Sequence, residues 1–294
     1  MMPDVSVAEW QEIRMLDLLR SFFASPVMLD ALLPSLLIAV VTASMSVMVM
    51  AHRLSYLTVG VSHASLAGLG LAVTLSLPLL PTATLFAVLV ALLLALMPRS
   101  KGISEDAGTG MLFAGSMALG IILISSASSA RVDLFGLLFG NILTVSGEDR
   151  FWLYLLAGFV LVTLALASRA WWSIAFDAVT AEASGLPVAG LRLLLYGLVG
   201  LTVILCVKLA GIVLTAGLMV LPAACAWLWG RSLGGLWLLS TLFSLLGTWI
   251  GLLWSYALEW PSGASVVMAL CILFVLSWAS NWGVVWLKSN ARKG

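Results

Sequence analysis

The run Ser62-His63-Ala64-Ser65 is the clearest group of chemically capable side chains in this chain, because it lies inside a long apolar block. His63 is one of only two histidines in the sequence. Ser62 and Ser65 are three residues apart, so a helix places them on the same face. A neutral imidazole can ligate a transition metal or relay a proton. The alternative is a histidine that is simply hydrogen-bonded to a neighbouring helix.

The composition indicates what kind of protein holds these residues. Of 294 residues, 62% are hydrophobic and 9% are charged, whereas ordinary soluble domains have about a quarter of their residues charged. The apolar blocks are roughly 17 to 26 residues long, which suits helices that cross a bilayer and is too long for barrel strands. The predicted fold is therefore an all-α, polytopic transmembrane bundle of about 8–9 spanning helices, and polar residues within it mark functional candidates.

The division of the chain follows from the charges and the apolar blocks. Residues 1–30 combine charges with apolar residues at helical spacing, which predicts an N-terminal interfacial helix, and residues 31–294 form one transmembrane domain. The predicted spans are 32–50, 57–78, 82–97, 107–127, 151–170, 191–209, 211–229, 233–257 and 263–287.

Residues 176–187 form a polar island between apolar blocks. Phe176, Val179 and Ala183 give it an apolar side, Gly185 closes it and Pro187 stops it, which predicts a short amphipathic helix outside the membrane. Placing this island on the cytoplasmic side leaves nine basic residues inside and two outside, as the positive-inside rule requires. The nine are Arg53, Arg99, Lys101, Arg169, Arg192, Arg231, Lys288, Arg292 and Lys293, and the two are Arg131 and Arg150.

This topology gives the outer face several carboxylates. Asp133 begins a predicted short amphipathic helix, and Glu148 and Asp149 follow it in the same external segment. Glu259 lies in another external turn. We expect them to receive a cation or the basic side chains of a docking protein. The alternative is that each acid is part of a solvated loop.

Enzymatic motifs are weak in this sequence. The spacing GxSxG occurs around Ser232, but in a basic turn and not after a strand, and neither HExxH nor a phosphate-binding GxxxxGK[ST] is present. The three cysteines form no CxxC pair, and Met45, Met48 and Met50 are expected to pack. His52 is expected to be solvated in a cytoplasmic turn.

Six stretches of the sequence occur in the order in which one family of membrane proteins has them. They are Arg53-Leu54-Ser55-Tyr56 with Ser62-His63-Ala64, residues 105–113, Asp133-Leu134 with residues 138–143, Phe176-Asp177 with residues 183–187, residues 211–214 with 221–224, and residues 261–264. With these stretches, the chain resembles the membrane permease of the metal-uptake ABC transporters, the family (ABC-3 type) that imports zinc, manganese or iron(II). The similarity runs from about Leu33 to Trp282.

The resemblance implies a type II importer fold, with two permease copies around one pore and a broken helix over residues 211–226. It implies an extracytoplasmic metal-binding protein as a partner, and ATP on a separate cytoplasmic subunit, so that this chain is no enzyme and binds no cofactor itself. It places the chain in the plasma (inner) membrane of a bacterial cell. Within the coupling segment 171–190, it implies contact with the ATPase through Phe176, Asp177, Glu182, Gly185, Leu186 and Pro187. The metal candidates are His63, Ser62, Ser65 and Asp133, and the docking candidates are Glu148, Asp149 and Glu259.

The sequence departs from the family at one position. The family commonly has an acid four residues before the histidine, and here that position is Val59. Valine cannot ligate or neutralise a cation, so a permease of the same fold for a metal chelate or a cobalamin-like ligand stays open. A stand-alone secondary transporter and an intramembrane serine hydrolase at Ser232 are the alternatives from other classes.

Overall fold

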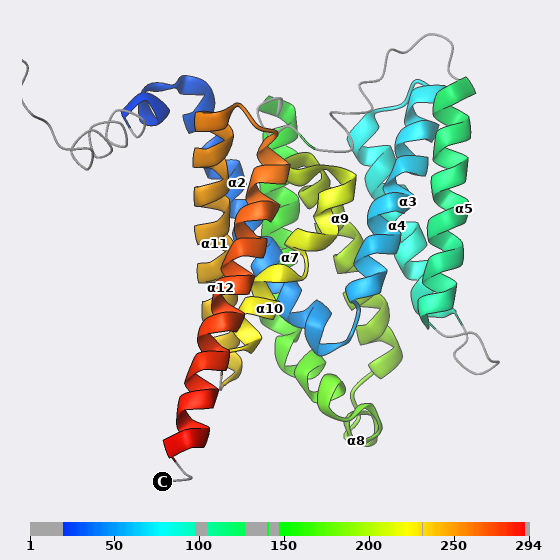
Figure 1. Ribbon diagram of the computed structural model, residues 1–294. Helices are drawn as coiled ribbons and strands as arrows, with labels where there is room; N and C mark the ends of the chain where they lie inside the picture. The colour runs from blue at the N-terminus through cyan, green and yellow to red at the C-terminus, as the bar shows by residue number, and fades with distance from the viewer. Residues whose placement is uncertain (1–19, 98–104, 127–139, 141–146, 231, 292–294) are drawn as a thin grey trace, which may run out of the picture.

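The computed structural model describes residues 20–97, 105–126, 140, 147–230 and 232–291. In this part of the chain all regular structure is helical, as predicted (Figure 1). After a turn of helix at residues 20–24, the helices are α2 (Pro26–Ala51), α3 (Ser55–Thr74), α4 (Leu79–Leu96), α5 (Glu105–Ser126), α7 (Gly147–Phe176), α8 (Ala178–Ala183), α9 (Val188–Leu218), α10 (Leu221–Trp227), α11 (Leu233–Leu258) and α12 (Ser262–Ala291).

Nine stretches within the described residues are long and apolar enough to cross a membrane, which confirms the predicted polytopic bundle. The boundaries differ locally. The second span was predicted to reach residue 78, but α3 ends at Thr74 because Ser76 has a left-handed backbone, with φ 53°, and Pro78 precedes α4. The fifth was predicted to end at residue 170, whereas α7 continues to Phe176.

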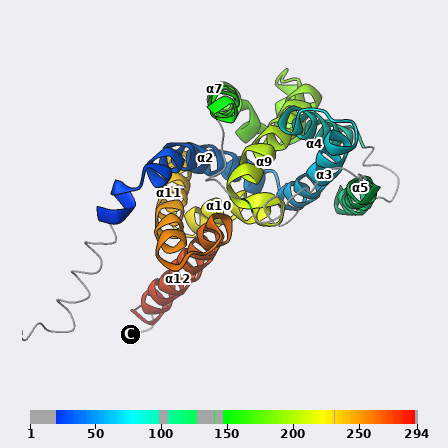
Figure 2. The same cartoon turned by 90° about the horizontal axis from the view of Figure 1, so that it is seen from above.

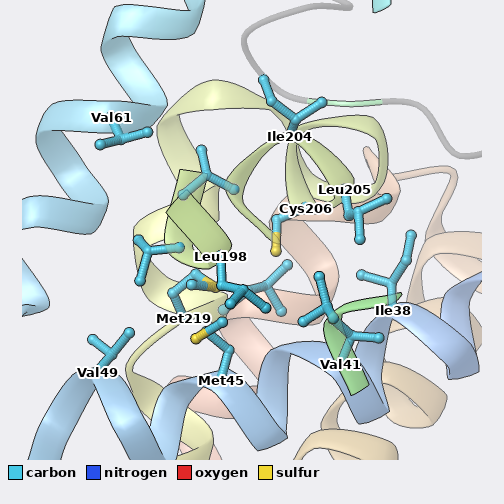
Figure 3. Close-up of a cluster of buried hydrophobic side chains, with 14 of the residues drawn as sticks. Ile38, Val41, Met45, Val49, Val61, Leu198, Ile204, Leu205, Cys206 and Met219 are labelled. Carbon is cyan, nitrogen blue, oxygen red and sulfur yellow. The ribbon is translucent and has the colours of Figure 1, made fainter. Parts of the chain in front are cut away.

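Seen from above, α9 lies at the centre of the molecule (Figure 2). The helices α3, α4 and α5 lie to one side of it, and α2, α10, α11 and α12 lie to the other, while α7 packs against α2 and α9. The buried centre is formed largely by α2 and α9, where Met45, Leu198 and Cys206 are fully buried (Figure 3). The prediction that Met45 and Met48 pack in the interior is confirmed.

The seventh span is broken, as the resemblance implied. Gly211 has φ 76° and ψ 171°, which is outside the helical region, and the chain then continues in helix to Leu218. A second break follows at Val220, and Pro222 lies in the first turn of α10. Glycine allows the first break because it has no Cβ to clash at positive φ.

Small and polar residues hold α11 against its neighbours. Ser240 donates to the carbonyl of Ala43 at 2.9 Å, and Ser244 donates to the carbonyl of Ala39 at 2.8 Å, which joins α11 to α2. Gly247 and Gly251 face α12 of the same chain, where a Cβ on Gly251 would lie 2.6 Å from the backbone nitrogen of Val266. This GxxxG pair therefore packs two helices within one chain, as small residues do in membrane bundles.

Candidate functional site

The polar island forms a six-residue helix, α8, that is capped at both ends. The Asp177 carboxylate accepts hydrogen bonds from the backbone N–H groups of Val179 and Thr180, at 3.0 and 3.3 Å, and from the Thr180 hydroxyl. These bonds, with the hydroxyl as the largest contribution, hold the pKa of Asp177 below its ordinary value. Asp177 is therefore ionised at neutral pH and serves as the N-cap.

The other end of α8 forms a Schellman motif. The N–H of Gly185 donates to the carbonyl of Glu182 at 2.9 Å, and the N–H of Leu186 donates to the carbonyl of Ala181 at 3.2 Å. Gly185 has φ 87°, the left-handed conformation that this motif requires. Pro187 then serves as the N-cap of α9, so the chain turns sharply back into the bundle.

The side chains of α8, and of Phe176 at the end of α7 just before it, are mostly turned away from the bundle. Phe176 and Val179 are 77% and 78% exposed, and Ala183 and Glu182 are also exposed. Only Ala181 of this helix is buried. Figure 1 shows α8 protruding at the end of the bundle, below α7 and α9. The predicted apolar side is thus a free surface in the isolated chain, and an exposed apolar pair of this kind is typical of an interaction site.

His63 has hydrogen-bond partners on its own helix. Its Nδ1 lies 3.0 Å from the carbonyl oxygen of Val59 and 3.4 Å from the hydroxyl of Ser62. A carbonyl can only accept, so its bond needs the proton on Nδ1, and the neutral ring with that proton has its lone pair on Nε2. The ring is half-buried and meets Phe113 of α5 edge to face, with centroids 4.8 Å apart.

The other metal candidates are placed differently. Ser62 and Ser65 are fully buried on α3, and their hydroxyls donate to the carbonyls of Val59 and Ser62 of the same helix. Asp133 lies outside the described residues. In the part of the chain that the structure describes, no group of three or more His, Cys, Asp or Glu side chains is arranged to hold a metal ion.

The candidate docking acids belong to the end of the bundle opposite α8. Glu148 and Asp149 are in the first turn of α7, about 40 Å along that helix from Phe176 at 1.5 Å per residue, and their side chains lie outside the described set. Glu259 is exposed and ends α11 in a left-handed conformation, with φ 55°. Sequence reasoning missed Asp30, whose carboxylate lies 3.4 Å from the Arg150 guanidinium at the same end.

His52 does not have the solvated environment that was predicted for it. It caps the C-terminus of α2, its ring is half-buried beside α7, and its Nε2 atom is buried without a hydrogen-bond partner. Burial lowers the pKa of His52, and a hydrogen bond to the backbone of Trp171 opposes this by a smaller amount. The prediction failed because only the tertiary structure brings α7 across the end of α2.

The lowered pKa of His52 predicts a stability that falls in acid. The unfolded chain binds this proton from about pH 6.5 downward, while the folded chain binds it only at lower pH. Stability is therefore lost as the pH falls from about 6.5 towards the pKa of the folded state. We expect the melting temperature of the purified protein to drop between pH 7.5 and 5.5, and H52Q to reduce that drop. R169Q, which changes an exposed residue of α7, is the control and should show the same drop in melting temperature as the unmodified protein. If H52Q also shows the full drop, His52 is not its cause.

Ser232 has a structural role. It is the N-cap of α11, and its hydroxyl accepts a hydrogen bond from the N–H of Gly235 at 3.2 Å. It follows a helix and not a strand, so the geometry of a hydrolase nucleophile is absent from this turn.

Nine candidate spans among the described residues, with a capped helix protruding at one end, define a multi-pass membrane protein. The family model for the ABC 3 transport family matches residues 24–281, most of the chain. The chain belongs to this family, which confirms the resemblance seen in the sequence motifs.

Known proteins similar to this chain have consistent names. The manganese transport system membrane protein MntC of Listeria monocytogenes is 31% identical over 262 residues, covering 88% of this chain and 93% of MntC. The chelated iron transport system membrane protein YfeD of Yersinia pestis is 28% identical, covering 88% of this chain and 87% of YfeD. A solved structure, PsaBC from Streptococcus pneumoniae in complex with Fab, matches with a TM-score of 0.80 and 27% identity, covering 90% of this chain and 95% of the matched chain.

Proposed function

We propose that this chain is the membrane-spanning permease of an ATP-driven importer for divalent transition metal ions, with manganese and zinc as the first candidates and iron as a further one. The observation that carries the proposal is α8, a helix capped at both ends that exposes Val179 next to the exposed Phe176 at the end of α7, at the basic end of a bundle of the ABC 3 family. The manganese transporters among its relatives support the choice of substrate.

In this proposal the chain hydrolyses no ATP and binds no cofactor. A separate ATP-binding subunit contacts Phe176, Asp177, Glu182, Gly185, Leu186 and Pro187 on the cytoplasmic side of the plasma membrane of a bacterial cell. Its movement is passed to the bundle through α7 and α9, which α8 contacts, and the pore opens alternately to each side. A second copy of the permease completes the pore.

The outer face of the proposed permease receives the metal. Glu148, Asp149 and Glu259 contact an extracytoplasmic metal-binding protein, and Asp133 lies at the entry. The acidic side chains attract a cation and the basic surface of a protein that delivers it.

Within the membrane, His63 is the proposed ligand, with Ser62 and Ser65 beside it. Its Nε2 atom would coordinate the ion through its lone pair. Nδ1 is held by the Val59 carbonyl, an arrangement that is common for histidines that bind metals. A path with few strong ligands lets an ion pass, because tight binding would stop release.

The metal role of His63 predicts a transport defect without a folding defect. We expect H63A to lower metal uptake about tenfold or more, while membrane expression and melting temperature change little, because the ring is only half-buried. Uptake of radioactive manganese into cells measures the effect. F113A, which removes the ring against His63 but no ligand, is the matched control, and equal uptake by H63A and the unmodified protein would refute the role of His63.

The elemental content of cells tests the function as a whole. Cells with and without this chain are grown in metal-limited medium, and their manganese, zinc and iron are measured by mass spectrometry. A selective loss of one metal in the deletion, restored by the intact gene, is the expected result and names the substrate. A deletion strain with unchanged content of all three metals and unchanged uptake rates would overturn the proposal.

A metal chelate is the second candidate substrate, and Val59 favours it. This residue stands where the family commonly has an acid, so the route past His63 lacks one carboxylate. The similarity to the chelated iron protein YfeD agrees with this alternative. Uptake of labelled chelate that exceeds uptake of the free ion would establish it.

A further inference from the structure

We propose that a cavity behind α8 binds the headgroup of an anionic phospholipid from the cytoplasmic leaflet. The cavity has a volume of about 390 Å³ and lies between the end of α2, the last turns of α7, α8 and the first turns of α9. That volume equals the share of about a dozen water molecules, and it is within the range of small-molecule sites.

The charges around the cavity select an anion. The guanidinium groups of Arg53 and Arg192 line it, opposed by the single carboxylate of Glu182. With His52 neutral, the lining carries a net charge of one positive unit, from two cations and one anion. A metal cation is disfavoured by the two arginines, whereas planar guanidinium groups suit the oxygens of a phosphate.

One of the two arginines of the cavity is held in place before a ligand arrives. Arg192 donates to the carbonyl of Ala95 at the end of α4, which fixes its guanidinium. Arg53 sits in a left-handed turn, with φ 59°, between α2 and α3. His52 also lines the cavity, and its Nε2 atom is buried behind that surface without a hydrogen-bond partner, which is unusual for a buried polar atom.

The position of the cavity indicates a lipid as the source of the phosphate. It opens where the spans 28–51, 150–176 and 188–207 begin or end, which is the level of the lipid headgroups. Besides Trp171 and Tyr196, its remaining lining consists of aliphatic side chains such as Leu54, Ile174 and Leu195, which suit the glycerol and the first carbons of acyl chains. Basic pockets between transmembrane helices on the cytoplasmic side are known to bind anionic headgroups.

A bound headgroup would lie between α8 and the turn between α2 and α3, since Ala178 and Glu182 of α8 and Arg53 of that turn line the same cavity. If the proposed function holds, a headgroup in this position changes how strongly movement of α8 is coupled to the bundle. The lipid binding itself does not depend on transport and is tested separately.

The test is native mass spectrometry of the purified full-length chain, titrated with phosphatidylglycerol or with phosphatidylcholine. We expect one phosphatidylglycerol to be retained per chain in preference to phosphatidylcholine. We expect R53Q to weaken its binding about fivefold and R53Q/R192Q about 25-fold, from about 1 kcal/mol for each basic residue near the membrane surface. R169Q is the matched control, because Arg169 is an exposed arginine of α7 outside the cavity. It should bind phosphatidylglycerol within twofold of the unmodified chain.

Two outcomes would overturn the proposal. Equal binding of phosphatidylglycerol by the unmodified chain and by R53Q would show that the cavity is not the site; this single variant leaves the bond between Arg192 and Ala95 intact, so a folding defect cannot mimic the result. Displacement of the lipid by about 10 mM inorganic phosphate would identify free phosphate as the ligand instead. Absence of metal transport by the unmodified chain, with lipid binding retained, would count against the proposed function and leave the lipid site standing.

Discussion

G185V is expected to lower metal uptake about tenfold or more while the bundle stays folded. Gly185 has φ 87°, where any side chain is strained whatever space surrounds it, and a β-branched residue is strained most. The left-handed conformation costs an ordinary residue about 1–2 kcal/mol. A helix of six residues cannot absorb that cost by itself, since isolated short helices are marginal in water. The Schellman motif would therefore open, and α8 would leave the position in which we propose that it meets an ATP-binding subunit.

The control for this prediction is G185N. Asparagine tolerates the left-handed region better than other side chains, and a Cβ at this position meets nothing within 4 Å. We expect G185N to keep most of the uptake, and both variants to reach the membrane in equal amounts on immunoblots. If G185V transports at the rate of the unmodified protein, α8 does not couple the chain to its ATPase.

G251A is expected to destabilise the bundle strongly, although it adds a single methyl group. The new Cβ would lie 2.6 Å from the backbone nitrogen of Val266 and still closer to its Cα, so backbone and not a flexible side chain blocks it. The helices α11 and α12 would have to move apart, and overpacking of this kind costs about 3 kcal/mol. The melting temperature of the purified protein in detergent measures the loss.

The same helix provides the control. Gly234 lies in the first turn of α11, and a Cβ there has nothing within 4 Å. G234A should leave the melting temperature unchanged or raise it slightly, because alanine favours helix over glycine. Equal melting temperatures for G251A and the unmodified protein would show that the two helices do not pack as closely as the structure has them.

The features that sequence predicted correctly are those set by local chemistry. The nine spans among the described residues follow from the length of the apolar blocks and the charges between them, and α8 follows from the polar island that Gly185 and Pro187 end. The N-cap Asp177 was not predicted, and the structure supplies it. The break at Gly211 came from the resemblance to the family, and its backbone angles confirm it. The assigned roles of His63 and of the outer acids stay predictions, since geometry alone does not test them.

The sequence by itself determined where this chain crosses the membrane, where it leaves it and how α8 ends, because each depends on residues that are neighbours along the chain. Tertiary structure alone decided that Ala181 is the buried residue of α8, that His52 lies in a cavity and that Gly251 meets α12. These three features depend on contacts between segments that are distant along the chain. The contact of Arg192 with Ala95 is another of this kind. The spanning helices are apolar on nearly all sides, so the pattern of residues along them does not reveal which side faces protein and which faces lipid.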